Sequence, residues 1–215
     1  IIRDAFVTVS MAFGDCIGEC EFNNNILIAN KEINWDNSAL KQGECFKIGR
    51  SGGQTKNWNI NHNTCYGKTG IVGLTSDAQK NVIWENNIIY VKGGVAISRS
   101  GLSTSNVIYD NNIYFREDKG TLFYNWNHDS DGSKFYTVEN AINSDHWNQN
   151  WDLNSINENP LFIDIINLDF TPSANSPACL MSTSGNYVGA VPCEIIEIVE
   201  EELVVEEPIV QEEPI

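Results

Sequence analysis

Hydrophobic and polar residues alternate around paired asparagines in three similar segments of the chain. Residues 81–90, Asn-Val-Ile-Trp-Glu-Asn-Asn-Ile-Ile-Tyr, are followed 25 residues later by Asn-Val-Ile-Tyr-Asp-Asn-Asn-Ile-Tyr-Phe at 106–115. A third copy, Asn-Trp-Asn-Ile-Asn-His-Asn-Thr-Cys-Tyr, lies 24 residues upstream at 57–66. In each copy, β-branched and aromatic residues flank a polar asparagine corner. This pattern is typical of a strand, a sharp bend and a second strand.

A fixed period of this length indicates a repeat architecture. A coil of three short strands needs roughly 20 to 25 residues, and stacked coils bury the apolar face that one coil cannot bury alone. Asparagine suits the bends because it tolerates a left-handed backbone and its amide can join a ladder of neighbours. The repeats therefore predict a parallel β-helix. A β-sandwich with Asn-rich turns fits the near-exact register of the copies less well.

Glycines mark a second predicted strand in each coil. We expect each of them to open a strand after a bend that needs a positive φ angle. This alignment predicts a lane of polar residues at one end of a stacked sheet, for which the plainer interpretation is a row of solvated strand ends. The glycines are Gly43, Gly70, Gly94 and Gly120, and the lane contains Lys47, Arg50, Asp77, Ser98, Arg99, Tyr124 and Asn125.

The repeat pattern changes at both ends. Residues 19–28 resemble a further copy, but their step of 38 residues to the next one predicts a loop insertion at 31–42. After Trp126 the period stops, and residues 137–143 predict a short helix with Thr137 as its N-cap.

Three short motifs follow, at residues 159–164 (Asn-Pro-Leu-Phe-Ile-Asp), 169–170 (Asp-Phe) and 176–178 (Ser-Pro-Ala). Together with the Asn-rich repeats, they resemble the end of secreted right-handed parallel β-helix proteins of the pectate-lyase-like group. The resemblance covers roughly residues 15–193. It implies an all-β, right-handed parallel β-helix with a closing C-terminal module. It says little about function, because that group includes lyases, glycosidases, epimerases, adhesins and structural stalks.

Charge and composition narrow the possible partners. The formal net charge is −16, and nine of the glutamates lie in residues 194–215. An acidic chain is a poor nucleic-acid binder, and no apolar run is long enough for a membrane span. We expect one β-helix domain at 1–193 and an acidic extended tail at 194–215. The tail is either a spacer or a strand that docks on another copy.

Six cysteines, an even number, favour disulfides and an extracellular or cell-surface location. Cys179 and Cys193 are the predicted pair, because both lie in the last segment expected to be ordered. The pairing of Cys16, Cys20, Cys45 and Cys65 stays open. Zinc is disfavoured because no second Cys/His pair has the spacing of a zinc site. The chain begins at Ile1 without Met, as we expect of a mature or excised segment.

Residues 127–132 suggest a calcium loop, because oxygen ligands at alternate positions precede a glycine. The candidate ligands are Asn127, Asp129 and Asp131. The first position is not Asp and Glu139 comes one place late, so an ordinary polar turn is the alternative.

The resembled lyases abstract a proton beside a uronate carboxylate with a basic residue. By that analogy Arg99 is a candidate base and Tyr124 or His128 a candidate acid, with Lys47, Lys92 or Arg116 as substrate clamps. No family signature matches them residue by residue. Trp126, Trp147 and Trp151 are candidates for stacking on sugar rings, and their alternative role is to seal the end of the core.

The sequence favours an extracellular solenoid that binds a polysaccharide or cell-surface glycan, or acts as an adhesive or structural module, without its own catalysis. The first alternative is the C-terminal part of a polysaccharide lyase or glycoside hydrolase. The second is a self-assembling surface filament whose subunits are linked by the tail.

Overall fold

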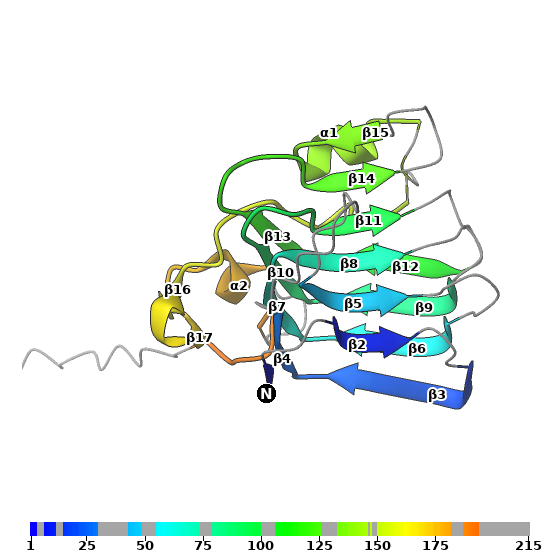
Figure 1. Ribbon diagram of the computed structural model, residues 1–215, viewed down its shortest axis with the longest axis horizontal. Helices are drawn as coiled ribbons and strands as arrows, with labels where there is room; N and C mark the ends of the chain where they lie inside the picture. Colours follow the sequence, from blue (N-terminus) through cyan, green and yellow to red (C-terminus); the bar gives the residue numbers. More distant parts are fainter. Residues whose placement is uncertain are drawn as a thin grey trace, which may run out of the picture.

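The computed structural model is a stack of coils, each made of three short strands joined at corners (Figure 1). It describes a set of ranges that covers most of the chain. These are residues 1–3, 7–11, 15–29, 43–48, 55–73, 79–99, 106–125, 133–145, 147, 150–181 and 187–193. The predicted insertion at 31–42 and the tail at 194–215 lie outside these ranges.

The strands form three sheets that run along the stack. Sheet A contains β1 (Ile2–Arg3), β4 (Ile26–Ala29), β7 (Thr64–Gly67), β10 (Ile88–Val91) and β13 (Ile113–Arg116). Sheet B contains β2 (Val7–Met11), β5 (Glu44–Ile48), β8 (Thr69–Gly73), β11 (Ile97–Arg99), β14 (Phe123–Asn125) and β15 (Ser133–Phe135). Sheet C contains β3 (Asp15–Asn23), β6 (Thr55–Asn61), β9 (Gln79–Glu85) and β12 (Val107–Asp110).

Neighbouring strands within each sheet come from successive coils and pair in parallel. In sheet A, for example, Ile88 pairs with Thr64 on one side and with Ile113 on the other. The exception in sheet B is β15, which pairs antiparallel with β14 at the end of the sheet. The predicted all-β parallel β-helix is therefore confirmed, and each copy of the repeat forms a sheet C strand, a corner and a sheet A strand.

Two adjacent residues have different roles at each corner between sheets C and A: one bends the backbone and the other forms hydrogen bonds inside the stack. The first has a left-handed backbone, with φ between 51° and 58° at Asn24, His62, Asn86 and Asn111. The second turns its amide into the stack and forms a buried ladder. For example, the Asn87 side-chain oxygen accepts from the Asn63 backbone N–H and side-chain amide, both at 3.0 Å. The ladder runs through Asn25, Asn63, Asn87 and Asn112 to the Ser155 hydroxyl.

Large side chains from the three sheets fill the interior of the coil stack. Phe46 meets Trp84 edge-on at 5.0 Å between ring centroids, and Trp84 stacks parallel on Tyr109 at 5.9 Å. A column of aromatic rings thus crosses several coils. It accounts for the aromatic residues found at the inward positions of the repeats.

The predicted role of the glycines holds for only one of the four. Gly43 precedes β5 with a φ of 125°, while Gly70, Gly94 and Gly120 are not among the residues with positive φ. Gly70 lies inside β8, where a Cβ atom would collide with the carbonyl oxygen of Ala96 and the side chain of Ile89. The constraint at Gly70 is therefore close packing between coils.

The last coil is closed by a segment that carries α1 (Val138–Ile142) and the two tryptophans at 147 and 151. The predicted helix is confirmed, and the Thr137 side chain accepts from the Asn140 N–H as its N-cap. Beneath this segment Asp152 is fully buried. It accepts from the hydroxyls of Tyr114 and Ser155, each at 2.8 Å.

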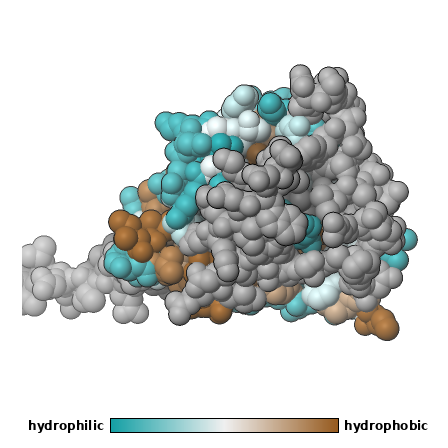
Figure 2. Space-filling model, viewed as in Figure 1, coloured by the Kyte–Doolittle hydropathy of each residue, from teal (hydrophilic) through white to brown (hydrophobic). Residues whose placement is uncertain are grey.

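A closing module covers the outer face of sheet A. It contains β16 (Phe162–Asp164), a 3-10 turn (Ile165–Asn167), β17 (Asp169–Pro172) and α2 (Pro177–Leu180). The motifs at 159–164 and 169–170 contribute β16 and β17, which pair antiparallel. Phe170 packs on Tyr66, so the module buries the outer face of sheet A, whose inner face lies in the core of the stack. Figure 2 shows a hydrophobic surface gathered over this module.

All six cysteines are in disulfides. The predicted pair Cys179 and Cys193 is joined, and the two other bonds are Cys16–Cys20 and Cys45–Cys65. The last of these lies inside the core and links sheet B to sheet A. Three disulfides indicate an oxidising environment. Within the described part of the chain, no helix has the length and apolar character needed to cross a membrane.

We expect Asn87→Ala to lower the free energy of unfolding by about 2–4 kcal/mol, because it removes the acceptor of two Asn63 donors and the donor to the Ile60 carbonyl. Urea denaturation measures this change. The control is Asn140→Ala on the exposed face of α1, for which we expect at most about 0.5 kcal/mol. Equal losses in both variants would show that the ladder does not stabilise the stack.

Asp152 generates a pH dependence of stability. Burial raises its pKa to about 6, although its hydrogen bonds to Tyr114, Ser155 and Trp147 lower it. The folded protein therefore holds this proton at pH values where the unfolded chain has released it. The protonated Asp152 carboxyl contributes its full share to the free energy of unfolding below about pH 4. This contribution is lost as the pH rises to about 6, so the free energy of unfolding falls by up to about 3 kcal/mol.

Denaturation of the wild type and of Asp152→Asn at several pH values isolates this contribution, because all other groups are common to both proteins. We expect the difference in unfolding free energy to move in favour of Asp152→Asn between pH 4 and pH 7. A difference that does not change with pH would contradict the assignment.

Candidate functional site

Sheet C differs from sheet A because its outward side chains face a groove and not a packed layer. The sequence already carries this difference. Sheet A strands bury most of their residues and Ile88–Val91 is buried throughout, whereas Val82-Ile-Trp-Glu85 alternates between inward and outward positions. Inward residues of sheet C, such as Val82 and Trp84, belong to the core. The outward residues are therefore available to form a site.

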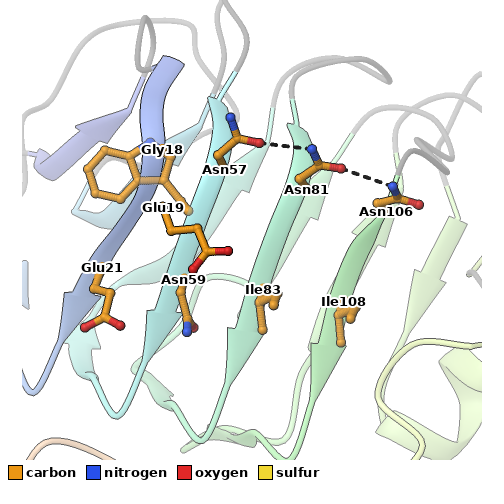
Figure 3. A pocket seen from close by; sticks show the side chains of 10 residues that line it. Gly18, Glu19, Glu21, Asn57, Asn59, Asn81, Ile83, Asn106 and Ile108 are labelled. Atoms are coloured by element: carbon orange, nitrogen blue, oxygen red, sulfur yellow. Dashed lines mark hydrogen bonds between the residues drawn. The ribbon is translucent and has the colours of Figure 1, made fainter.

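The outward residues of sheet C line a groove of about 670 Å³, which we call the sheet C groove (Figure 3). It crosses the strands β3, β6, β9 and β12 and so runs along the axis of the stack. Its lining residues are Gly18, Glu19, Glu21, Asn57, Trp58, Asn59, Asn81, Ile83, Asn106 and Ile108.

One side of the groove is a second asparagine ladder, the amide row. The Asn106 side-chain amide donates to the oxygen of Asn81 at 3.1 Å, and Asn81 donates in the same way to Asn57 at 3.0 Å. All three residues have a left-handed backbone, with φ between 52° and 60°. An amide has two N–H groups and an oxygen with two lone pairs. Each member of the row therefore keeps hydrogen-bonding capacity beyond the ladder.

The floor of the groove beside the amide row is apolar at its β9 and β12 end. Ile83 and Ile108 are register partners on these two strands and both point outward. Ile108 is 42% exposed, although its strand otherwise buries its hydrophobic residues. An adjacent pair of outward isoleucines between polar rows offers a surface for the apolar face of a ligand.

Acidic residues supply the charge of the groove and of the row next to it. Glu19 and Glu21 on β3 are the charged residues of the lining, and Glu21 accepts from the Asn23 amide at 2.9 Å. In the adjacent outward row, Glu85 and Asp110 are register partners. Burial, and to a smaller extent the carboxylate of Asp110, raises the pKa of Glu85 above its usual value. The nearby cations Lys56 and Lys80 pair with each other in register and precede the amide row, outside the lining.

Two of the predicted sugar-stacking tryptophans do not lie on a binding surface. Trp147 and Trp151 are 2% and 3% exposed, and their rings meet edge-on at 5.9 Å. The Trp151 indole N–H donates to the Val107 carbonyl at 2.7 Å. These residues seal the end of the core. Each ring removes a large apolar area from water in this position, which favours burial over exposure on a surface. Trp126 lies outside the described residues.

The candidates for catalysis and for metal binding are only partly described. Arg99 lies on β11, but its side chain is outside the described residues, as are His128 and the calcium candidates Asn127, Asp129 and Asp131. Tyr124 is half-buried on β14, in register with Ser98. In the part of the chain that the structure describes, no group of three His, Cys, Asp or Glu residues is arranged to hold a metal ion.

Of the predicted polar lane of sheet B, Arg50, Asp77 and the side chain of Arg99 lie outside the described residues, and the other members do not all face solvent. Ser98 and Asn125 are buried, and Lys47 is paired with the Glu44 carboxylate at 3.6 Å. Of the suggested clamps, Arg116 is bonded to Asp118 and to the Thr121 carbonyl. The Lys92 ammonium lies 4.4 Å from the centre of the Tyr66 ring. These cations are engaged in local contacts.

The sheet C groove is not among the sites predicted from the sequence, although the repeats carry a signal for it. Asn57, Asn81 and Asn106 are the first residues of the three copies, whereas the predicted ladder concerns the asparagines at the corners. The second signal is isoleucine at positions 83 and 108, which the alternation assigns to the outward face.

The chain matches no family model, and no curated protein or solved structure matches it.

Proposed function

We propose that this protein is an extracellular glycan-binding module without its own catalysis, and that the sheet C groove holds the glycan. The observation that carries the proposal is the combination of an amide row with an adjacent pair of outward isoleucines in one elongated groove. Sugars combine the same two features, polar hydrogen-bonding groups and an apolar surface, since hydroxyl groups surround a ring whose C–H faces are apolar. A solvated groove on rigid strands suits such a ligand.

Three further features support the proposal. The disulfides fit a protein that works outside the reducing cytosol. The groove carries polar residues that can fix a ligand by hydrogen bonds without ionic contacts. The closing module with β16, β17 and α2 is consistent with membership of the secreted, pectate-lyase-like β-helix group, which we propose as its origin.

No specific observation favours the other two functions. The lyase alternative depends on the side chain of Arg99 and on His128, and the filament alternative depends on residues 194–215. All of these lie outside the described residues.

Binding to an array of neutral, acidic and amino-sugar oligosaccharides tests the proposal, followed by calorimetry on the best ligand. We expect the double variant Ile83→Thr/Ile108→Thr to bind at least about tenfold more weakly, because each change removes two side-chain carbons, of which one is replaced by a hydroxyl, at about 0.8 kcal/mol per buried carbon. Threonine keeps the β-branched shape that suits a strand.

The matched control is Ile163→Thr/Ile166→Thr in the closing module, where both isoleucines are exposed. We expect this variant to bind like the wild type. Equal losses in the two double variants would remove the sheet C groove from consideration. The absence of binding to every glycan on the array would refute the proposed function.

A further inference from the structure

We propose that the sheet C groove selects an uncharged β-1,4-linked polysaccharide laid along the axis of the stack. This inference rests on the proposed glycan binding and names the class of ligand. Three properties of the groove lead to it: the spacing of its amides, the apolar pair on its floor and the sign of its charge.

The spacing of the amide row matches an extended sugar chain. Neighbouring strands in a sheet are about 4.8 Å apart, so Asn57, Asn81 and Asn106 present equivalent groups at that interval. A β-1,4-linked pyranose chain is straight and places successive rings at a similar interval. An α-1,4-linked chain coils instead and cannot keep its rings in step with a straight row. The four strands of the groove span about 14 Å, which accommodates three to four sugars.

The arrangement of polar and apolar side chains in the groove suits a flat ribbon. In a β-1,4-linked chain the broad faces of the rings carry C–H groups and the edges carry hydroxyl groups. The pair Ile83 and Ile108 lies where a broad face would rest, and the amide row lies along one edge (Figure 3). A sugar chain in this position can place its hydroxyl groups against the amides and its C–H faces against the isoleucines at the same time.

The charge of the groove disfavours acidic polysaccharides. Glu19 and Glu21 line it, no Lys or Arg is among its described lining residues, and Glu85 and Asp110 lie in the adjacent row. A polyuronate would bring a carboxylate on every sugar close to these groups, and like charges repel one another at this range. Lys56 and Lys80 lie beyond the amide row at the opposite margin. An uncharged chain avoids the repulsion and still uses the amides.

Calorimetry with four hexasaccharides tests the inference on the whole protein. The probes are cellohexaose and chitohexaose, which are uncharged and β-1,4-linked, maltohexaose, which is uncharged and α-1,4-linked, and hexamannuronate, which is β-1,4-linked and anionic. We expect at least one of the first two to bind about tenfold more tightly than maltohexaose and hexamannuronate. We expect the affinity of the preferred ligand to be nearly independent of salt, because no ionic contact is involved.

Equal or tighter binding of maltohexaose would overturn the assignment of an extended chain, and a preference for hexamannuronate would overturn the assignment of an uncharged one. If none of the four binds while other glycans on the array do, this inference fails and the proposed function stands. If no glycan binds at all, both fail.

A charge reversal provides the matched variant. Glu19→Lys/Glu21→Lys should raise the affinity for hexamannuronate by about tenfold or more and leave that for the preferred neutral hexasaccharide within about threefold. The control is Glu139→Lys/Glu158→Lys, which makes the same change in net charge at two exposed positions outside the groove. An equal gain in the control would show that net charge alone excludes the polyuronate, and the absence of a gain in either variant would show that repulsion in the groove does not exclude it.

Discussion

The buried asparagine ladder is the interaction on which the rest of the structure depends. Each amide oxygen accepts two hydrogen bonds from the coil before it, and its NH₂ group also donates to a backbone carbonyl, as Asn112 does to Trp84. An unpaired buried amide is costly, so every coil has to meet its neighbours at the same corner. The left-handed residue that precedes each ladder position fixes the direction of the bend. The ladder thereby sets the register of sheets A and C together.

A common register has a functional consequence on the outside of the stack. When inward residues such as Val82 and Val107 are in step, the outward residues between them are also in step, and rows of like side chains form without further interactions. The amide row is such a result, since its three members come from equivalent positions of three coils. A row of equivalent side chains is suited to a ligand with equivalent units in a line, and a linear polymer has such units.

The three sheets share one architecture but have different surroundings. Sheet A is covered by the closing module and is buried on both faces. The end of the core is closed by Trp147 and Trp151, and Ser155 and Asp152 terminate the ladder there. Sheet C keeps a groove on its outward face. The site therefore lies where the fold leaves a regular face uncovered, on strands whose positions are fixed from inside.

The sequence by itself determined the period, the strand–corner–strand unit, the helix after Thr137 and the parallel β-helix, because these depend on local backbone preference and on spacing that can be read along the chain. Only the tertiary structure decided which of two similar residues faces inward. Trp147 and Trp151 are buried at the end of the core, and Asn87 and Asn81 both join ladders, one inside the stack and the other outside it. Burial depends on which surfaces the closing module and the neighbouring coils cover. It is therefore set by contacts between residues that are distant in the sequence.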